Sequence, residues 1–136
     1  MTVCVCIDDN GGMTFNNRRQ SRDREVIKDI ESLVGDKVLY VSDFSEDLFV
    51  KSSASVICIP DPLAISSSEA VVFVENLPLS PYAEKIDKLV IYKWNRCYPF
   101  DTVLDVNPKN EGFTLIKATD FVGKSHEKIT KEVYVK

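Results

Sequence analysis

The run GFTLIKATDFVGKSHEKITKEVYVK, residues 112–136, decides which kind of sheet this chain builds. Its two flanks, 112–121 and 128–136, are rich in β-branched and aromatic residues, which favour strands. The connection between them, VGKSHE, is short and polar. The run therefore predicts an antiparallel hairpin at the C-terminal end of the sequence.

Upstream of this hairpin, strand-like and helix-like segments alternate. Short apolar runs predict five strands, at residues 2–7, 37–41, 54–59, 70–75 and 89–94. Residues 22–34 place apolar side chains at helical spacing, with Ser21 as the expected N-cap and Gly35 as the stop. A short helical turn is expected over 43–49, and Ser80 with Pro81 opens a further helix.

Strands that alternate with helices and end in a hairpin predict an α/β fold. The expected architecture is a single mostly parallel sheet with flanking helices on both faces and a C-terminal antiparallel hairpin. The 136 residues are expected to form one domain, 1–136. Ligands of such sheets bind beyond the carboxyl ends of the strands, where the loop after the first strand, residues 8–21, begins.

Composition excludes several classes of function. A formal net charge of −4 argues against nucleic acid as the partner, because duplex affinity depends on phosphate neutralisation. No apolar run approaches the ~20 residues of a membrane span, and no signal-peptide pattern follows Met1, so a cytoplasmic protein is expected. The four cysteines lie in apolar runs and predict buried thiols rather than disulfides.

The single histidine, His126, limits the chemistry further. It excludes a multi-histidine metal centre, and no metal site is expected. A Ser-His-Asp or Cys-His pair would have to use His126, and the chain has no Gly-x-Ser-x-Gly nucleophile elbow.

The loop DDNGGMTFNNRRQSRDR, residues 8–24, concentrates backbone freedom and positive charge. Gly11 and Gly12 permit close approach by a ligand. Four arginines lie within seven residues, at 18, 19, 22 and 24. Guanidinium groups near a helix N-terminus suit a phosphate or carboxylate. Three interpretations stay open: an anion site, a contact with a protein or RNA, and a plain turn whose arginines are solvated or paired with nearby acids while Asp23 caps the helix.

The order of these segments resembles dihydrofolate reductase. The opening strand with DDNGGM and the following helix with Asp23 in its first turn resemble the start of that family. IDKLVIYKWNRCYPFDTVLDV, residues 86–106, is similar to its strand after the last helix, with Asp101–Thr102 matching an aspartate–threonine pair in a long return connection. Residues 112–136 resemble its closing hairpin. The resemblance implies the family's fold and a pterin ligand, with Asp23 as the acid that binds the pterin ring.

The chain departs from that family where the cofactor NADPH binds. YVSDFSEDLF, residues 40–49, is acidic and stands where the resemblance implies a Gly-Arg-x-Thr motif. VENLPLSP, residues 74–81, replaces a Gly-Gly pair that lets backbone approach the pyrophosphate. FNNRRQSRD lacks the Leu-Pro-Trp step. These departures argue against NADPH and leave the cofactor unspecified. The chain also resembles small bacterial proteins of unknown role that share GGM followed by RRQSRD.

Three hypotheses follow. The first is a protein that binds an anionic, pterin- or nucleotide-like small molecule on a divergent reductase-like fold; if it is an enzyme, Asp23 is the acid–base group. The expected ligand-binding residues are Gly11, Gly12, Met13, Asn17, Arg18, Arg19, Arg22, Lys93 and Arg96. The second is a non-catalytic interaction module that uses the arginine-rich loop, and the third is an NADPH-dependent reductase with an atypical cofactor site.

Overall fold

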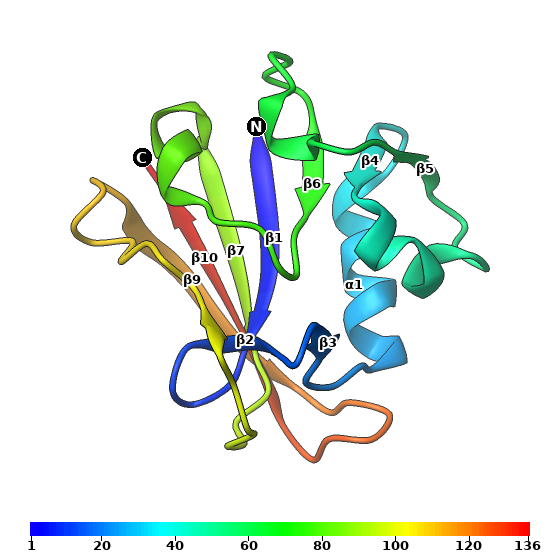
Figure 1. Cartoon of the computed structure of the whole chain (residues 1–136), viewed down its shortest axis with the longest axis vertical. Coiled ribbons are helices and arrows are strands. Elements are labelled where there is room, and N and C mark those ends of the chain that lie inside the picture. The colour runs from blue at the N-terminus through cyan, green and yellow to red at the C-terminus, as the bar shows by residue number, and fades with distance from the viewer.

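A seven-stranded sheet forms the centre of the computed structural model, which describes all residues from Met1 to Lys136 (Figure 1). Its order is β5-β4-β6-β1-β7-β10-β9. The strands are β1 (Thr2–Ile7), β4 (Val38–Val41), β5 (Ser55–Cys58), β6 (Val71–Phe73), β7 (Lys88–Lys93), β9 (Thr114–Phe121) and β10 (Ile129–Val135). In this order, the neighbouring strands from β5 through β4, β6 and β1 to β7 pair in parallel. β10 is antiparallel to both of its neighbours, β7 and β9. The expected α/β class, mostly parallel sheet and C-terminal hairpin are confirmed.

One α-helix covers the first face of the sheet. α1 (Arg24–Val34) buries Val26, Ile30 and Val34 against the strands, as its helical spacing predicts. Its N-cap is Asp23 rather than the expected Ser21, because the Asp23 side chain accepts a hydrogen bond from the backbone N–H of Glu25. The 3₁₀ helix η1 (Asp43–Phe49) packs beside α1 and adds Phe49 to the same core.

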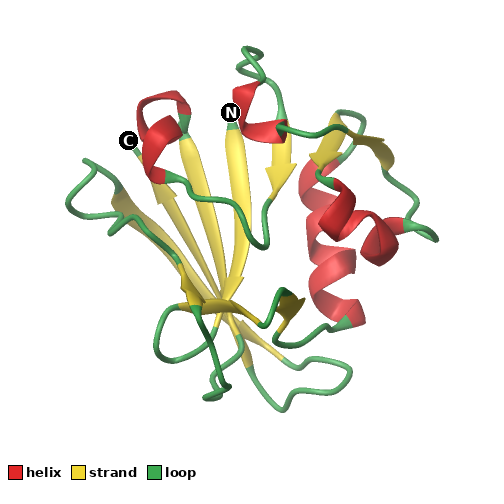
Figure 2. Cartoon of the chain, viewed as in Figure 1, coloured by secondary structure: helices red, strands yellow, loops and turns green.

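The opposite face is covered by shorter pieces. The segment at Ser80 is not a full α-helix but the 3₁₀ helix η3 (Ser80–Lys85). The residues that flank this helix, Leu79 and Ile86, are both buried in the same core. The chain must therefore leave that core and return to it within the six residues of η3. The 3₁₀ helix η2 (Pro62–Ala64) and the long connection before β9 contribute Leu63 and Phe113. Helical segments therefore flank both faces (Figure 2). Only one of them, α1, is an α-helix. No helix combines the length and apolar character needed to cross a membrane.

The opening loop forms a second, small sheet that the sequence did not predict. β2 (Gly12–Phe15) pairs with β3 (Arg18–Arg19) and with β8 (Thr102–Val103). Asn16 and Asn17 connect β2 to β3, both with positive φ, as a tight hairpin turn requires. This three-stranded sheet lies across the carboxyl end of β1 (Figure 1).

Candidate functional site

Three connections meet at the carboxyl ends of the parallel strands (Figure 1). They are residues 8–23 after β1, residues 94–101 after β7, and residues 122–128 between β9 and β10. This edge of an open α/β sheet is where ligands bind. The arginine-rich loop therefore lies where the sequence placed it, and the other two connections contact it.

Asp8 ties two of these connections together. It is 2% exposed, and its carboxylate accepts the backbone N–H groups of Asn10 at 2.9 Å, Gly12 at 2.7 Å and Tyr98 at 3.1 Å. The amide of Gln20 donates to the same carboxylate at 3.2 Å. The path of the opening loop is therefore set by a buried carboxylate at the end of β1.

Arg19 joins the segments that follow β4 and β6. Its guanidinium donates to both oxygens of Glu75, at 2.8 and 3.0 Å, and to both oxygens of Asp47, each at 2.8 Å. It also donates to the Phe44 carbonyl at 3.0 Å, while Ser45 Oγ donates to Glu75 at 2.7 Å. Glu75 follows β6 and is 7% exposed, whereas Phe44, Ser45 and Asp47 belong to η1 after β4.

This network gives Arg19 a structural role. The hydrogen bond with Glu75 is the main reason why the pKa of Arg19 lies above its usual range, even though burial acts in the opposite direction. Two edges of its guanidinium group donate hydrogen bonds to carboxylates of the same chain. The expectation that Arg19 binds an external anion therefore finds no support in the geometry.

Asp23 joins the start of α1 to the β9–β10 connection. Its side chain is 0% exposed and accepts the backbone N–H groups of Glu25 at 2.9 Å, Lys124 at 2.8 Å and Ser125 at 2.9 Å. His126 Nδ1 lies 2.8 Å from Asp23 Oδ2. Burial alone would raise the pKa of Asp23, but the hydrogen bonds from His126 and the three backbone groups outweigh it and hold that pKa well below its usual range.

A carboxylate in this state is not arranged as a general acid or base. Its oxygens are occupied, it is buried, and its lowered pKa keeps it ionised. The predicted acid–base role of Asp23 therefore finds no support here, and the predicted role as helix cap does.

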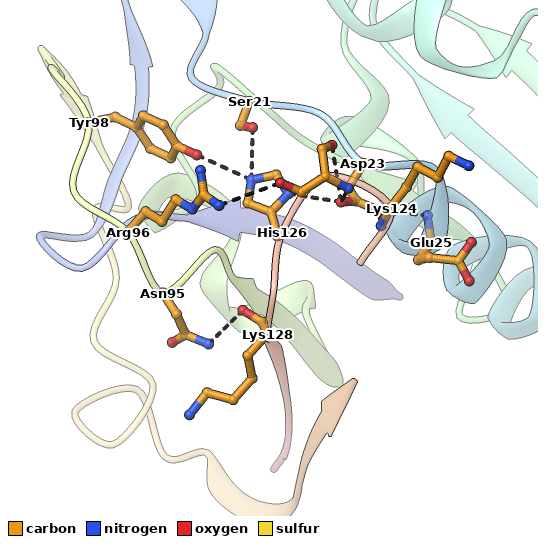
Figure 3. Close-up of polar contacts among 10 residues, drawn as sticks. Ser21, Asp23, Glu25, Asn95, Arg96, Tyr98, Lys124, His126 and Lys128 are labelled. Atoms are coloured by element: carbon orange, nitrogen blue, oxygen red, sulfur yellow. Dashed lines mark hydrogen bonds and ion pairs between the residues drawn. The ribbon is translucent and has the colours of Figure 1, made fainter. Parts of the chain in front are cut away.

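His126 is the centre of a buried polar cluster that sequence reasoning set aside (Figure 3). Its ring stacks on Trp94, with 4.6 Å between ring centroids. Its Nε2 lies 3.0 Å from Ser21 Oγ and 3.2 Å from the hydroxyl of Tyr98. Because the ionised Asp23 can only accept, His126 Nδ1 carries a proton, and Nε2 faces the two hydroxyls, each of which is able to donate to it.

The sequence carried only an indirect indication of this cluster. Ser21 and His126 are separated by 105 positions, so no spacing motif could reveal their contact. The available indication was topological: the loop after the first strand was expected at the carboxyl edge of the sheet, and a closing strand that runs antiparallel to a parallel neighbour, as β10 does beside β7, begins at that edge. The lone histidine falls in the loop that precedes this strand.

A cleft of about 660 Å³ opens beside this cluster, between α1, the residues after η1 and the β9–β10 connection. Four of the side chains that line it are exposed cations without an ion-pair partner: Arg22, Arg24, Lys51 and Lys124. The three acids of its wall make contacts of their own: Asp23 accepts from the backbone of Lys124 and Ser125 and from His126. Glu31 accepts from Ser52 and Ser53, and Asp47 accepts from Arg19. The lining therefore carries five cations against three acids, an excess of positive charge.

Three of the predicted ligand-binding residues serve the fold of the opening loop. Met13 is 5% exposed and belongs to the core beneath η2 and η3. Gly12 is required by packing, because a Cβ there would lie 2.6 Å from Phe100 Cβ. Gly11 has a φ of +75° and open space around it, so it supplies turn geometry.

The remaining predicted residues do not converge on one point. Asn17 forms the β2–β3 turn, and Arg18 lines a separate depression of about 600 Å³ with Tyr98. Lys93 pairs with Glu132 on β10 at 3.1 Å. Arg96 reaches the Ser125 carbonyl at 3.5 Å, and Arg22 is the member of the set that lines the cationic cleft.

Comparison with known proteins identifies the fold. No family model and no curated protein matches the sequence. Among solved structures, the chain is similar to a dihydrofolate reductase from Enterococcus faecalis, solved in complex with NADP(H) and RAB-propyl. The TM-score is 0.70 at 9% sequence identity, and the match covers 98% of this chain and 94% of that one. The chain therefore has a dihydrofolate reductase-like fold.

Proposed function

We propose that the protein binds an anionic small molecule, pterin- or nucleotide-like, in the cleft between α1 and the residues after η1. The observation that carries the proposal is the set of four unpaired cations around a cavity of about 660 Å³, in a chain whose net charge is −4. A molecule with a phosphate or carboxylate group gains charge-assisted hydrogen bonds from Arg22 and Arg24 there. The reductase-like fold supports a ligand at this edge of the sheet.

Isothermal titration calorimetry with dihydrofolate and with ADP tests the proposal. We expect one of the two to bind with a micromolar Kd that weakens as salt is added, because exposed cations are screened. Replacing two cations of the cleft, Arg22→Ser with Lys124→Ser, should weaken binding at least tenfold. The matched control, Lys109→Ser with Lys117→Ser, makes the same charge change on exposed residues that do not line the cleft. Absence of heat at millimolar ligand, or equal losses in both double variants, would contradict the proposal.

NADPH is not the ligand we expect. The depression beside β4 and β5, of about 440 Å³, is lined by Asp43 and Glu46, which have no ion-pair partner and whose charges repel phosphate groups. Calorimetry with NADPH in the presence and absence of dihydrofolate should therefore give no binding. Micromolar binding of NADPH would favour the reductase hypothesis instead, and assays of reductase activity would follow.

A further inference from the structure

The polar cluster at His126 has a geometry that the binding of an anion in the cleft does not explain. Ser21 Oγ lies 3.0 Å from His126 Nε2, and His126 Nδ1 lies 2.8 Å from Asp23 Oδ2 (Figure 3). A hydroxyl, an imidazole and a buried carboxylate joined in this order form the arrangement that activates a serine nucleophile. From this arrangement we infer that Ser21 is a nucleophile toward carboxylic esters, with His126 as its general base and Asp23 as a positioning residue.

Contacts with the face of the ring and with Nδ1 fix the orientation of His126. Trp94 stacks on the ring, and Asp23 holds the Nδ1 proton. Asp23 is itself held by the backbone N–H groups of Lys124 and Ser125. This leaves the lone pair of Nε2 directed at hydroxyl groups, as a general base for a serine requires.

Two features bear on the access of a substrate to Ser21. Ser21 is only partly buried, and the residues that follow it, Arg22 and Asp23, line the cavity of about 660 Å³. The backbone N–H groups of Ser21 and Arg22 donate no hydrogen bond within the chain. They are therefore free to donate to an oxyanion in the proposed reaction.

The reaction needs no cofactor. Ser21 Oγ attacks the ester carbonyl carbon while its proton passes to His126 Nε2. The bond from carbon to the leaving oxygen then breaks, and His126 returns the proton to the departing alcohol. Water next attacks the acyl-serine, again giving its proton to His126, and the carboxylic acid leaves as Ser21 regains its hydrogen. Tyr98, 3.2 Å from Nε2, competes with Ser21 for that lone pair in the resting state.

A fluorophosphonate probe tests the proposal on the whole chain, with the site of modification mapped by mass spectrometry. We expect a single adduct, on Ser21, that Ser21→Ala abolishes and that forms at least 100-fold more slowly in His126→Gln. Ser66→Ala, which removes an exposed serine outside the cluster, should not change the labelling rate. Hydrolysis of 4-nitrophenyl acetate should follow the same order.

Two further variants separate chemistry from folding. Ser21→Cys keeps the size of the side chain, and its thiol should react with iodoacetamide at least tenfold faster than Cys97, because His126 accepts the thiol proton. The pH dependence of the labelling rate should also be measured in Asp23→Asn. The pH below which the rate falls should be lower in this variant, because the imidazolium loses its negative partner. A loss of packing alone would not change that pH. The proposal is overturned if folded protein, judged by circular dichroism, gives no adduct on Ser21. It is also overturned if folded His126→Gln is labelled at the wild-type rate. Neither arm depends on the anionic ligand proposed above.

Discussion

At the scale of single residues, Asp23 has the most consequences for this molecule. Its carboxylate caps α1 and holds a loop that lies 103 positions further along the chain. Removing it leaves several buried N–H groups without an acceptor, and each such loss costs about 1–3 kcal/mol. The cap itself is worth about 1 kcal/mol.

We therefore expect Asp23→Ala to lower the free energy of unfolding by roughly 3 kcal/mol in urea denaturation at pH 7. Asp36→Ala is the matched control, because Asp36 is exposed and makes no side-chain contact with a charged or polar partner. A loss below about 1 kcal/mol for Asp23→Ala would show that water replaces the carboxylate without penalty.

Arg19 provides the second test at this scale. Its removal leaves Glu75, which is 7% exposed, without its cation. Breaking a buried ion pair from one side costs about 3–5 kcal/mol, so Arg19→Met should be strongly destabilising. Arg18→Met replaces the exposed neighbour, which has no ion pair, and should stay within about 0.5 kcal/mol of the wild type. Thermal unfolding followed by circular dichroism distinguishes the two, and equal effects would contradict the role given to Arg19.

At the scale of elements, the β2–β3 hairpin converts the opening loop into a defined structure. Its turn requires positive φ at both Asn16 and Asn17, of 51° and 60°. A β-branched residue in that conformation costs about 1–2 kcal/mol, whereas glycine adopts it freely.

Asn17→Val should therefore lower the free energy of unfolding by about 1 kcal/mol, and Asn17→Gly should leave it unchanged or raise it slightly. Because β3 carries Arg19, the valine variant should also weaken the Arg19–Glu75 pair. Urea titrations of the two variants provide the measurement. Equal stability of both would mean that the hairpin contributes nothing to the folded state.

Elements with strong periodicity were predictable from the sequence. The seven strands of the main sheet and the helix at 24–34 follow from runs of β-branched residues and from apolar spacing, both of which are local properties. The 3₁₀ form of η3 was not predictable, because it depends on burying Leu79 and Ile86 in one core. The pairing of β2 with β8 was equally hidden, since it joins the opening loop to the distant pair Thr102–Val103.

The candidate site was predictable in place but not in composition. The sequence put the arginine-rich loop at the carboxyl edge of the sheet, as the structure does. The sequence could not show which arginines form ion pairs within the chain, because Glu75 and Asp47 lie 56 and 28 positions from Arg19. The contact of Ser21 with His126 depends on the same kind of long-range closure.

At the scale of the whole molecule, the carboxylates predict how stability depends on pH. Besides Asp23, the N–H of Ser53 lowers the pKa of Glu31, and Arg19 lowers the pKa of Asp47. A lowered pKa means that the unfolded chain binds protons more readily than the folded chain. The stabilisation is therefore complete above the ordinary carboxyl pKa values, near pH 4, and is lost as the pH falls through the folded-state values.

We expect the urea midpoint to stay nearly constant from pH 7 to pH 5 and to fall steeply below about pH 4. Asp23→Asn should flatten the acid part of this profile, because a buried carboxylate that loses stability by protonation is absent. Urea titrations followed by tryptophan fluorescence at each pH give the curve. An unchanged acid slope in the variant would contradict the role of Asp23 in acid unfolding.

The position of β10 affects how the chain folds while it is being synthesised. β10 pairs with β7 on one side and β9 on the other, although it follows both in the chain. While a ribosome is still synthesising residues 129–135, β9 has no strand to pair with, and the edge of β7 stays open. Unpaired edges of this kind associate with one another. Nascent chains that pause before β10 should therefore depend on chaperones, and premature termination there should yield insoluble protein rather than a partly folded domain.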